Sequence, residues 1–83
     1  MFIFDDDVIS IDGVGAEQFE CTIEGNPPLA GDSIIEFDGA HILIAFSQDV
    51  SSATVGTLLS GEGIVFANGG VAADGQSVPV QNP

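Results

Sequence analysis

The sequence predicts an all-β antiparallel fold, a small sandwich or barrel of six or seven short strands with room for one short helix. Apolar and polar residues alternate with period two along much of the chain, which is typical of strands with one buried face. Turn-forming dipeptides such as Asp38-Gly39 separate the alternating runs. A chain of 83 residues is long enough for one domain. We therefore expect a single small β domain over residues 1–83, with a loose tail from about 77 to 83.

The clearest alternating run is Glu17–Glu24, where Phe19, Cys21 and Ile23 share one face and polar or acidic residues share the other. Two further runs show the same alternation. The residues predicted to face inward are Ile9 and Ile11 in Val8–Asp12, and Ile35 and Phe37 in Ser33–Asp38.

The run His41–Phe46 is apolar on both faces, which indicates a central strand covered on both sides. In so small a domain, another subunit would supply the second cover. Asn68-Gly69-Gly70 predicts a hairpin turn between two further strands, Ile64–Ala67 and Val71–Ala73. Pro79 confines the last segment, Ser77–Val80, to a sheet edge or an extended arm because it has no N–H to donate. The segment Val50–Ser60 fits either a short helix or an irregular turn.

The charge balance is the strongest signal for function. The chain has 13 acidic residues and no Lys or Arg, so its formal net charge is −13. Without cations, the chain cannot bind nucleic acid through phosphate contacts, and it has no attraction to an anionic membrane. Four interpretations remain open: docking on a basic partner, mimicry of nucleic acid, adaptation to high salt or to proteases, and a biased proteome.

The charges are also unevenly placed, because 11 of the 13 acidic residues lie between Asp5 and Asp49. The uncharged C-terminal part suits close packing in a subunit interface. We expect a protein partner, such as a capsid shell, and a homo-oligomeric or multi-copy arrangement. The candidate partner-binding residues are Asp5, Asp6, Asp7, Glu17, Glu20, Glu24, Glu36 and Asp38.

No catalytic, cofactor or metal site is expected. His41 and Cys21 are the only histidine and cysteine, so neither a zinc cluster nor an intrachain disulfide can form. Cys21 is interpreted as a small buried apolar residue, and His41 as an ordinary strand residue. Three consecutive carboxylates, Asp5 to Asp7, cannot all point at one calcium ion.

The sequence shows no membrane span, because its longest apolar run, Ile42–Phe46, is far shorter than the ~20 residues that a spanning helix needs. The start, Met1 to Asp7, lacks the basic residues and the apolar length of a signal peptide. We therefore expect the protein in a virion or in the cytoplasm.

One stretch resembles a known family. Ile44–Val55 is similar to the strand and following F-S-x-x-V-x-x-x-T-V pattern of bacterial Ig-like surface modules. The resemblance covers about a dozen residues and implies a sandwich-like packing of strands.

These observations favour a non-enzymatic structural accessory protein of a virus particle, of the capsid cement or decoration type of a tailed phage. One alternative is an acidic mimic of nucleic acid that inhibits a DNA-binding enzyme. Another is a β module of a tail, fibre or surface-layer assembly. A mimic needs a continuous acidic stripe on one face, whereas a cement protein needs an apolar or uncharged docking surface.

Overall fold

The computed structural model describes residues 1–53 and 55–81. In these ranges the chain forms nine short strands and one turn of 3-10 helix, and all the strand pairs are antiparallel. The all-β prediction is therefore confirmed, with more and shorter strands than expected. The elements are β1 (Phe2–Ile3), β2 (Val8–Ser10), η1 (Ala16–Gln18), β3 (Phe19–Cys21), β4 (Leu29–Ala30), β5 (Ser33–Asp38), β6 (His41–Ala45), β7 (Val55–Leu58), β8 (Val65–Phe66) and β9 (Gln76–Pro79).

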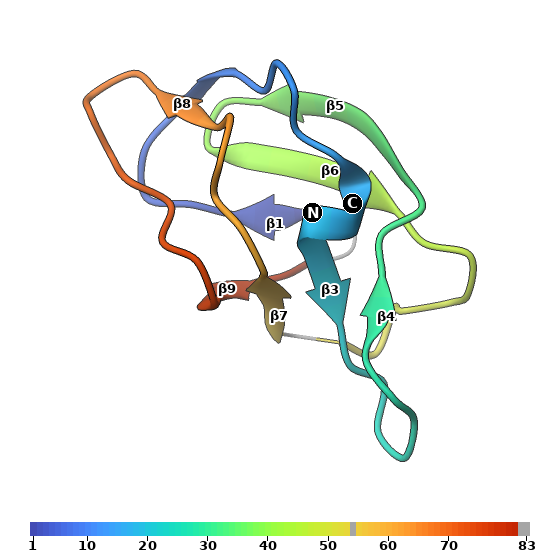
Figure 1. Ribbon diagram of the computed structural model, residues 1–83. Helices are drawn as coiled ribbons and strands as arrows, with labels where there is room; N and C mark the ends of the chain where they lie inside the picture. Colours follow the sequence, from blue (N-terminus) through green and yellow to red (C-terminus); the bar gives the residue numbers. More distant parts are fainter. Residues whose placement is uncertain (54, 82–83) are drawn as a thin grey trace.

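The strands form three sheets, with the orders β1-β6-β5, β2-β8 and β4-β3-β7-β9 (Figure 1). A bridge between Phe2 and Val80 joins the first sheet to the third. The chain also passes from β4 to β5 through Gly31 and Asp32 alone, so the segment 29–38 runs from the four-stranded sheet into the three-stranded sheet. At this corner the Gly31 N–H donates to the Phe19 carbonyl oxygen, and the Asp32 N–H donates to that of Ala45, each at 2.8 Å. The sheets thus wrap around one core.

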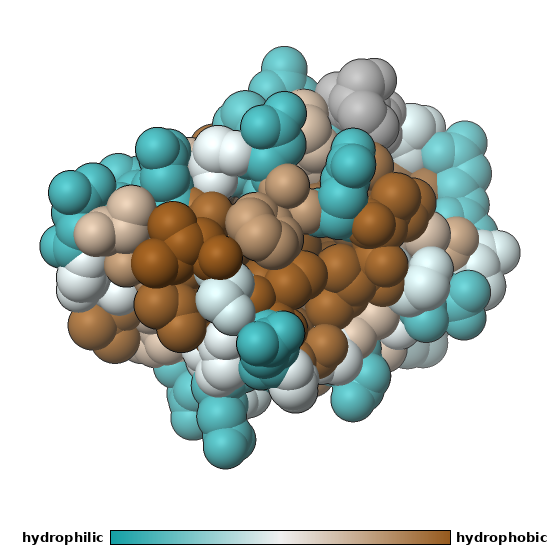
Figure 2. Space-filling view, turned by 90° about the horizontal axis from the view of Figure 1, so that it is seen from above, coloured by the Kyte–Doolittle hydropathy of each residue, from teal (hydrophilic) through white to brown (hydrophobic). Residues whose placement is uncertain are grey.

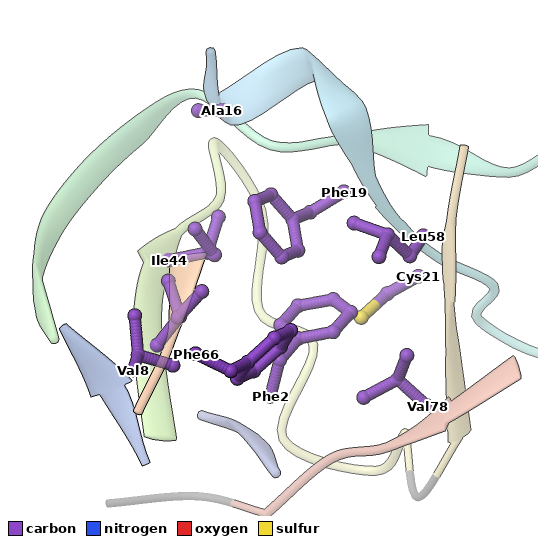
Figure 3. Packing of buried hydrophobic residues seen from close by; sticks show 10 residues of the cluster. Phe2, Val8, Ala16, Phe19, Cys21, Ile44, Leu58, Phe66 and Val78 are labelled. Atoms are coloured by element: carbon purple, nitrogen blue, oxygen red, sulfur yellow. The ribbon is translucent and has the colours of Figure 1, made fainter. Parts of the chain in front are cut away.

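The core lies between the sheets and is entirely hydrophobic (Figure 3). The ring of Phe2 meets the ring of Phe19 edge-on, with 4.9 Å between the ring centroids. Burying a large apolar side chain contributes roughly 1.5–3 kcal/mol, so this small set supplies much of the stability of the domain. The inward positions predicted for Phe19 and Cys21 are confirmed, whereas Ile23 lies beyond the end of β3 and is half-buried. The fully buried large side chains are Phe2, Phe19, Ile42, Leu58 and Val78.

The predicted orientation of β5 is wrong at Ile35, because the strand contains a β-bulge. Ile34 pairs with Ile44 and Glu36 pairs with Leu43, so Ile35 has no residue opposite it on β6. A bulge shifts the alternation by one residue, and Ile34 packs on the core while 58% of Ile35 is exposed. Phe37 lies opposite the buried Ile42, yet 38% of it is exposed at the edge of the sheet.

A second register shift, in β2, makes the inward position predicted for Ile9 wrong. Val8 pairs with Phe66 and Ser10 pairs with Val65, so the register of β2 shifts between Val8 and Ser10. Val8 is buried in place of Ile9, which is 56% exposed. Ile11, beyond the strand, packs on the core as predicted.

The helix considered for Val50–Ser60 is not present in the described residues, which include all of this segment except Thr54. A turn at Ser51 and Ser52 leads to β7, which pairs with β3 on one side and β9 on the other. The spacing of Val55, Leu58 and Leu59 fits a helix only weakly. Backbone pairing with β3 and β9 therefore decides that this segment is a strand. The one helical turn of the described chain lies at Ala16–Gln18 instead.

The hairpin predicted around Asn68-Gly69-Gly70 is also wrong, because β8 pairs with β2 and residues 71–73 form no strand. By contrast, the turn at Gly39 is confirmed: it closes the β5–β6 hairpin, with a φ of 56° that glycine adopts easily. The central position of β6 is confirmed as well.

The C-terminal segment is not the loose tail expected from about residue 77 onward. β9 pairs with β7 at the edge of its sheet, where Pro79 was predicted to lie. The terminal ammonium of Met1 donates to the Gln81 carbonyl oxygen at 2.7 Å, and the Gln81 N–H donates to that of Met1 at 2.9 Å. These contacts hold the chain as far as residue 81; residues 82–83 lie outside the described part. No helix within residues 1–53 and 55–81 has the length and apolar character to cross a membrane.

Candidate docking surface

An apolar cleft of about 210 Å³ opens where β1 and β6 meet the loop after β6 and the end of β9. Its lining contains no charged side chain. Half-buried side chains of β6 and of the following loop form the walls, and three core residues, Phe2, Cys21 and Ile44, contribute to the lining. The lining residues are Met1, Phe2, Cys21, Ile35, Leu43, Ile44, Phe46, Val50, Ala53, Val80 and Gln81.

Ile35 is the most exposed apolar side chain that lines the cleft. The bulge in β5 places it there, since without the extra residue Ile35 would follow the alternation and face inward. Leu43 on the neighbouring strand also lines the cleft and is only half-buried. The second face of β6, predicted to need a cover, is therefore only partly covered within the described chain.

The floor of the cleft is built from packed aromatic rings and a buried thiol. The rings of Phe2 and Phe46 are stacked with 6.4 Å between their centroids, and Phe2 also packs on Phe19. Cys21 is free and only 2% exposed. Burial raises the pKa of its thiol, and the terminal ammonium of Met1 opposes this rise only in part. A thiol in this state is a packing group rather than a nucleophile.

The apolar surface continues beyond the cleft. Figure 2, which looks down on β5 and β8 from above Figure 1, shows apolar side chains gathered across this side of the molecule with polar groups around them. The strands that meet here carry four of the large exposed apolar side chains: Ile9, Ile35, Phe37 and Val65. Patches of this kind on small soluble proteins mark interaction sites more often than chance exposure does.

Part of the predicted acidic set borders this surface. Residues that pair across an antiparallel ladder share a face, so Glu36 lies on the side of Leu43 and Asp38 on the side of His41. The segment containing Asp5 and Asp7 runs beside the same hairpin, because the N–H groups of Phe4 and Val8 donate to the carbonyl oxygens of Ala40 and Gly39, both at 2.8 Å. The exposed carboxylates of Asp5, Asp7, Glu36 and Asp38 therefore gather near the β5–β6 turn.

Unlike Asp5 and Asp7, Asp6 binds another part of the chain through its carboxylate. Its carboxylate accepts hydrogen bonds from the backbone N–H groups of Asn68 and Gly70 and from Nδ2 of Asn68, at 2.9–3.2 Å. Desolvation disfavours the charged form, but these hydrogen bonds and one from the Asp7 N–H outweigh it and lower the pKa of Asp6. Asp6 thus holds the loop after β8, and its carboxylate is engaged within the chain.

The remaining predicted residues, Glu17, Glu20 and Glu24, lie on η1, on β3 and in the loop after β3. They belong to the four-stranded sheet and its connections, whereas Glu36 and Asp38 belong to the three-stranded sheet. The structure therefore does not bring the predicted carboxylates into one stripe. Within the described residues, no three metal-ligating side chains lie close enough to hold an ion.

Sequence reasoning missed Ile35 and Leu43 as surface residues. A signal was present, since Val8-Ile9 and Ile34-Ile35 are both adjacent apolar pairs that interrupt a period-two pattern. An interruption of this kind is typical of a bulge, and both pairs do coincide with register shifts. Comparison with known proteins adds no further indication: no family model, no curated protein and no solved structure matches the chain.

Proposed function

We propose that the chain is a non-enzymatic structural accessory protein that docks, in many copies, on a larger protein assembly, of the capsid cement or decoration type of a tailed-phage particle. The observation that carries the proposal is the apolar cleft, whose lining holds no charged side chain and whose wall exposes Ile35, on the strand that also exposes Glu36 and Asp38. An apolar centre with a charged rim is the usual anatomy of a protein interface.

The occupant that fits this surface is a shell protein with an apolar projection flanked by basic side chains. A second copy of the chain is a poorer occupant, because two bodies of formal charge −13 repel each other. Docking on a repetitive lattice also suits so small a domain, since multivalent attachment adds avidity without a large interface. On this proposal the protein belongs to the virion.

The alternative of a nucleic-acid mimic has less support, because Glu17, Glu20 and Glu24 lie on the four-stranded sheet and its connections, whereas Glu36 and Asp38 lie on the three-stranded sheet. A mimic needs closely spaced charges along one continuous face. This alternative is one of the outcomes of the experiment below.

The test is an affinity pull-down with the tagged protein from its native host or particle preparation, at about 0.05 M and about 0.3 M salt, since salt screens exposed charges. The bait should be digested with a Glu-specific protease for mass spectrometry, because trypsin finds no Lys or Arg in it. Two variants add one negative charge each: Ile35→Asp in the cleft, and Val71→Asp at a position that is 85% exposed and outside the cleft.

We expect recovery of a major shell or tail protein in near-stoichiometric amount, lost with Ile35→Asp and retained with Val71→Asp. Recovery of a DNA-binding enzyme that salt releases, and that Ile35→Asp does not affect, would overturn the proposal in favour of mimicry. Equal loss of a shell protein with both variants would show that added charge, rather than the cleft, decides binding.

A further inference from the structure

The β5 strand has an unused backbone edge. It is the terminal strand of the sheet β1-β6-β5, and it is the longest strand of the described chain (Figure 1). Every residue of β5 except Ile34 is exposed. Within residues 1–53 and 55–81, the backbone of β5 pairs only with β6. An exposed edge strand is a template on which another extended chain can pair.

The hairpin geometry identifies which backbone groups point outward. The loop between Asp38 and His41 contains only Gly39 and Ala40, so Asp38 and His41 form the hydrogen-bonded pair that closes the hairpin. The next pair, Phe37 with Ile42, is then a non-hydrogen-bonded pair. The N–H and C=O of Phe37 point away from β6, towards the open edge, while Ile42 lies opposite Phe2 of β1 on its other side.

The side chains around Phe37 set the chemistry that this edge accepts. Glu36 and Asp38 flank it on the outer face, and Phe37 itself shares the opposite face with Ile42. A strand added beside them would place alternate residues opposite two carboxylates and the residue between them opposite an aromatic ring. That spacing corresponds to a basic, apolar, basic pattern.

The same carboxylates reject a second copy of this strand. If β5 paired with β5 of another molecule, carboxylates would face carboxylates across the ladder, and like charges in that position are destabilising. The chain also has no Lys or Arg with which to neutralise them. The edge is therefore selective by charge: it excludes self-pairing and favours a cationic strand.

We propose that β5 is a strand-addition edge that takes an extended segment of a protein partner with alternating basic and apolar residues. This inference rests on the proposed function for the source of that segment, which would be an arm or loop of the shell protein. The backbone of Phe37 supplies the hydrogen bonds, Glu36 and Asp38 supply the charge selection, and the neighbouring cleft at Ile35 accepts an apolar side chain of the same partner.

The test uses a synthetic peptide, acetyl-Thr-Lys-Val-Lys-Val-Lys-Thr-amide, titrated into the ¹⁵N-labelled protein and followed by NMR. The control peptide, acetyl-Thr-Lys-Lys-Lys-Val-Val-Thr-amide, has the same composition and charge but no alternation. We expect the alternating peptide to shift the β5 signals and to slow solvent exchange of the Phe37 amide, while the control peptide does neither.

Two double variants separate local pairing from general attraction. Glu36→Gln with Asp38→Asn should weaken binding of the alternating peptide by roughly 2- to 20-fold in Kd. Glu24→Gln with Glu62→Gln removes the same charge from two exposed loops away from β5 and should change Kd by less than about twofold, because distant exposed charges are screened.

Equal binding of both peptides without protection of Phe37 would overturn the proposal, since it would indicate charge attraction alone. Absence of binding by either peptide would also overturn it, and recovery of a shell protein in the pull-down would then leave the proposed function standing. Binding of the alternating peptide together with a pull-down that recovers no assembly protein would retain the strand-addition edge and reject the particle role.

Discussion

The carboxylate of Asp6 is bound to Asn68, 62 positions further along the chain, through both the backbone N–H and the side-chain Nδ2 of that residue, the latter at 2.9 Å. A third donor, the N–H of Gly70, completes the contact. This clasp fixes the loop after β8 against the segment that leads into β2. It also explains why only two of the three consecutive aspartates remain available to a partner.

We predict that Asp6→Ala releases this loop, so that the amides of Asn68 and Gly70 exchange faster with solvent. Asp5→Ala is the matched control, since Asp5 is adjacent and exposed. The folded-state pKa of Asp6 is lowered, so its contribution to stability is present above the unfolded value of about 3.9 and is lost as pH falls through the folded-state pKa. Amide exchange measured against pH checks both statements. Unchanged exchange in Asp6→Ala would show that other contacts hold the loop.

We predict that Gly56→Ala destabilises the protein. A Cβ at this position would lie 2.5 Å from Cε2 of Phe2 and 2.9 Å from the carbonyl oxygen of Glu20. Overpacking of this kind costs about 1–3 kcal/mol, and each kcal/mol lowers the Tm of a domain of this size by roughly 4–8 °C. Thermal unfolding followed by circular dichroism measures the change, with Ser77→Ala on the exposed side of β9 as the control. Equal Tm values for both variants would contradict close packing at Gly56.

We predict that two adjacent leucines respond very differently to truncation. Leu58 is fully buried, whereas Leu59 is 45% exposed. Leu58→Ala should lower the free energy of unfolding by about 2–5 kcal/mol. Leu59→Ala should cost less than about 1 kcal/mol, as is usual for exposed positions. Urea titrations of the two variants provide the comparison. Similar midpoints would contradict the strand orientation of β7, and a helix over this segment would be one arrangement that places both leucines on one face.

We predict that the thiol of Cys21 is unreactive in the folded protein. It is buried beneath the cleft, and burial raises its pKa, so little thiolate forms at neutral pH. Because the folded-state pKa is the higher one, the neutral thiol contributes stability that is complete below the unfolded value of about 8.5 and is lost as pH rises through the folded-state pKa. In the folded protein, a disulfide reagent should modify Cys21 only as fast as the structure around it opens. In denaturant, the same reagent should modify Cys21 completely. Rapid reaction under native conditions would show that the cleft exposes the sulfur.

The parts of the fold that follow from local pattern could be predicted from the sequence. Phe19 and Cys21 alternate strictly with polar residues, and Asp38-Gly39 is a strong turn signal, so both features are confirmed. Pro79 lies on a strand at a sheet edge, where its missing N–H leaves no gap in the hydrogen bonding of the sheet interior. Each of these depends on a few neighbouring residues.

The errors arose where pairing partners far along the chain decide the outcome. β7 has the leucine spacing of a weak helix, and only β3 and β9 on its two sides make it a strand. Ile9 and Ile35 were predicted to face inward, but the register with β8 and β6 introduces a bulge at each, and both side chains are exposed. The candidate acidic residues were identified by type alone, and their division between two sheets depends on the whole topology.

The corner at Gly31 has a consequence for how the domain unfolds. One continuous segment carries hydrogen bonds to β3 at its start and to β6 at its end, and a Cβ at Gly31 would lie only 2.7 Å from Cγ2 of Ile44. Neither sheet can separate from the core without pulling, through the short connection at Gly31 and Asp32, on a strand of the other sheet. The two sheets should therefore open together, as a single cooperative unit, and native-state hydrogen exchange should give one common opening free energy for β3, β6 and β7 rather than a separate value for each sheet.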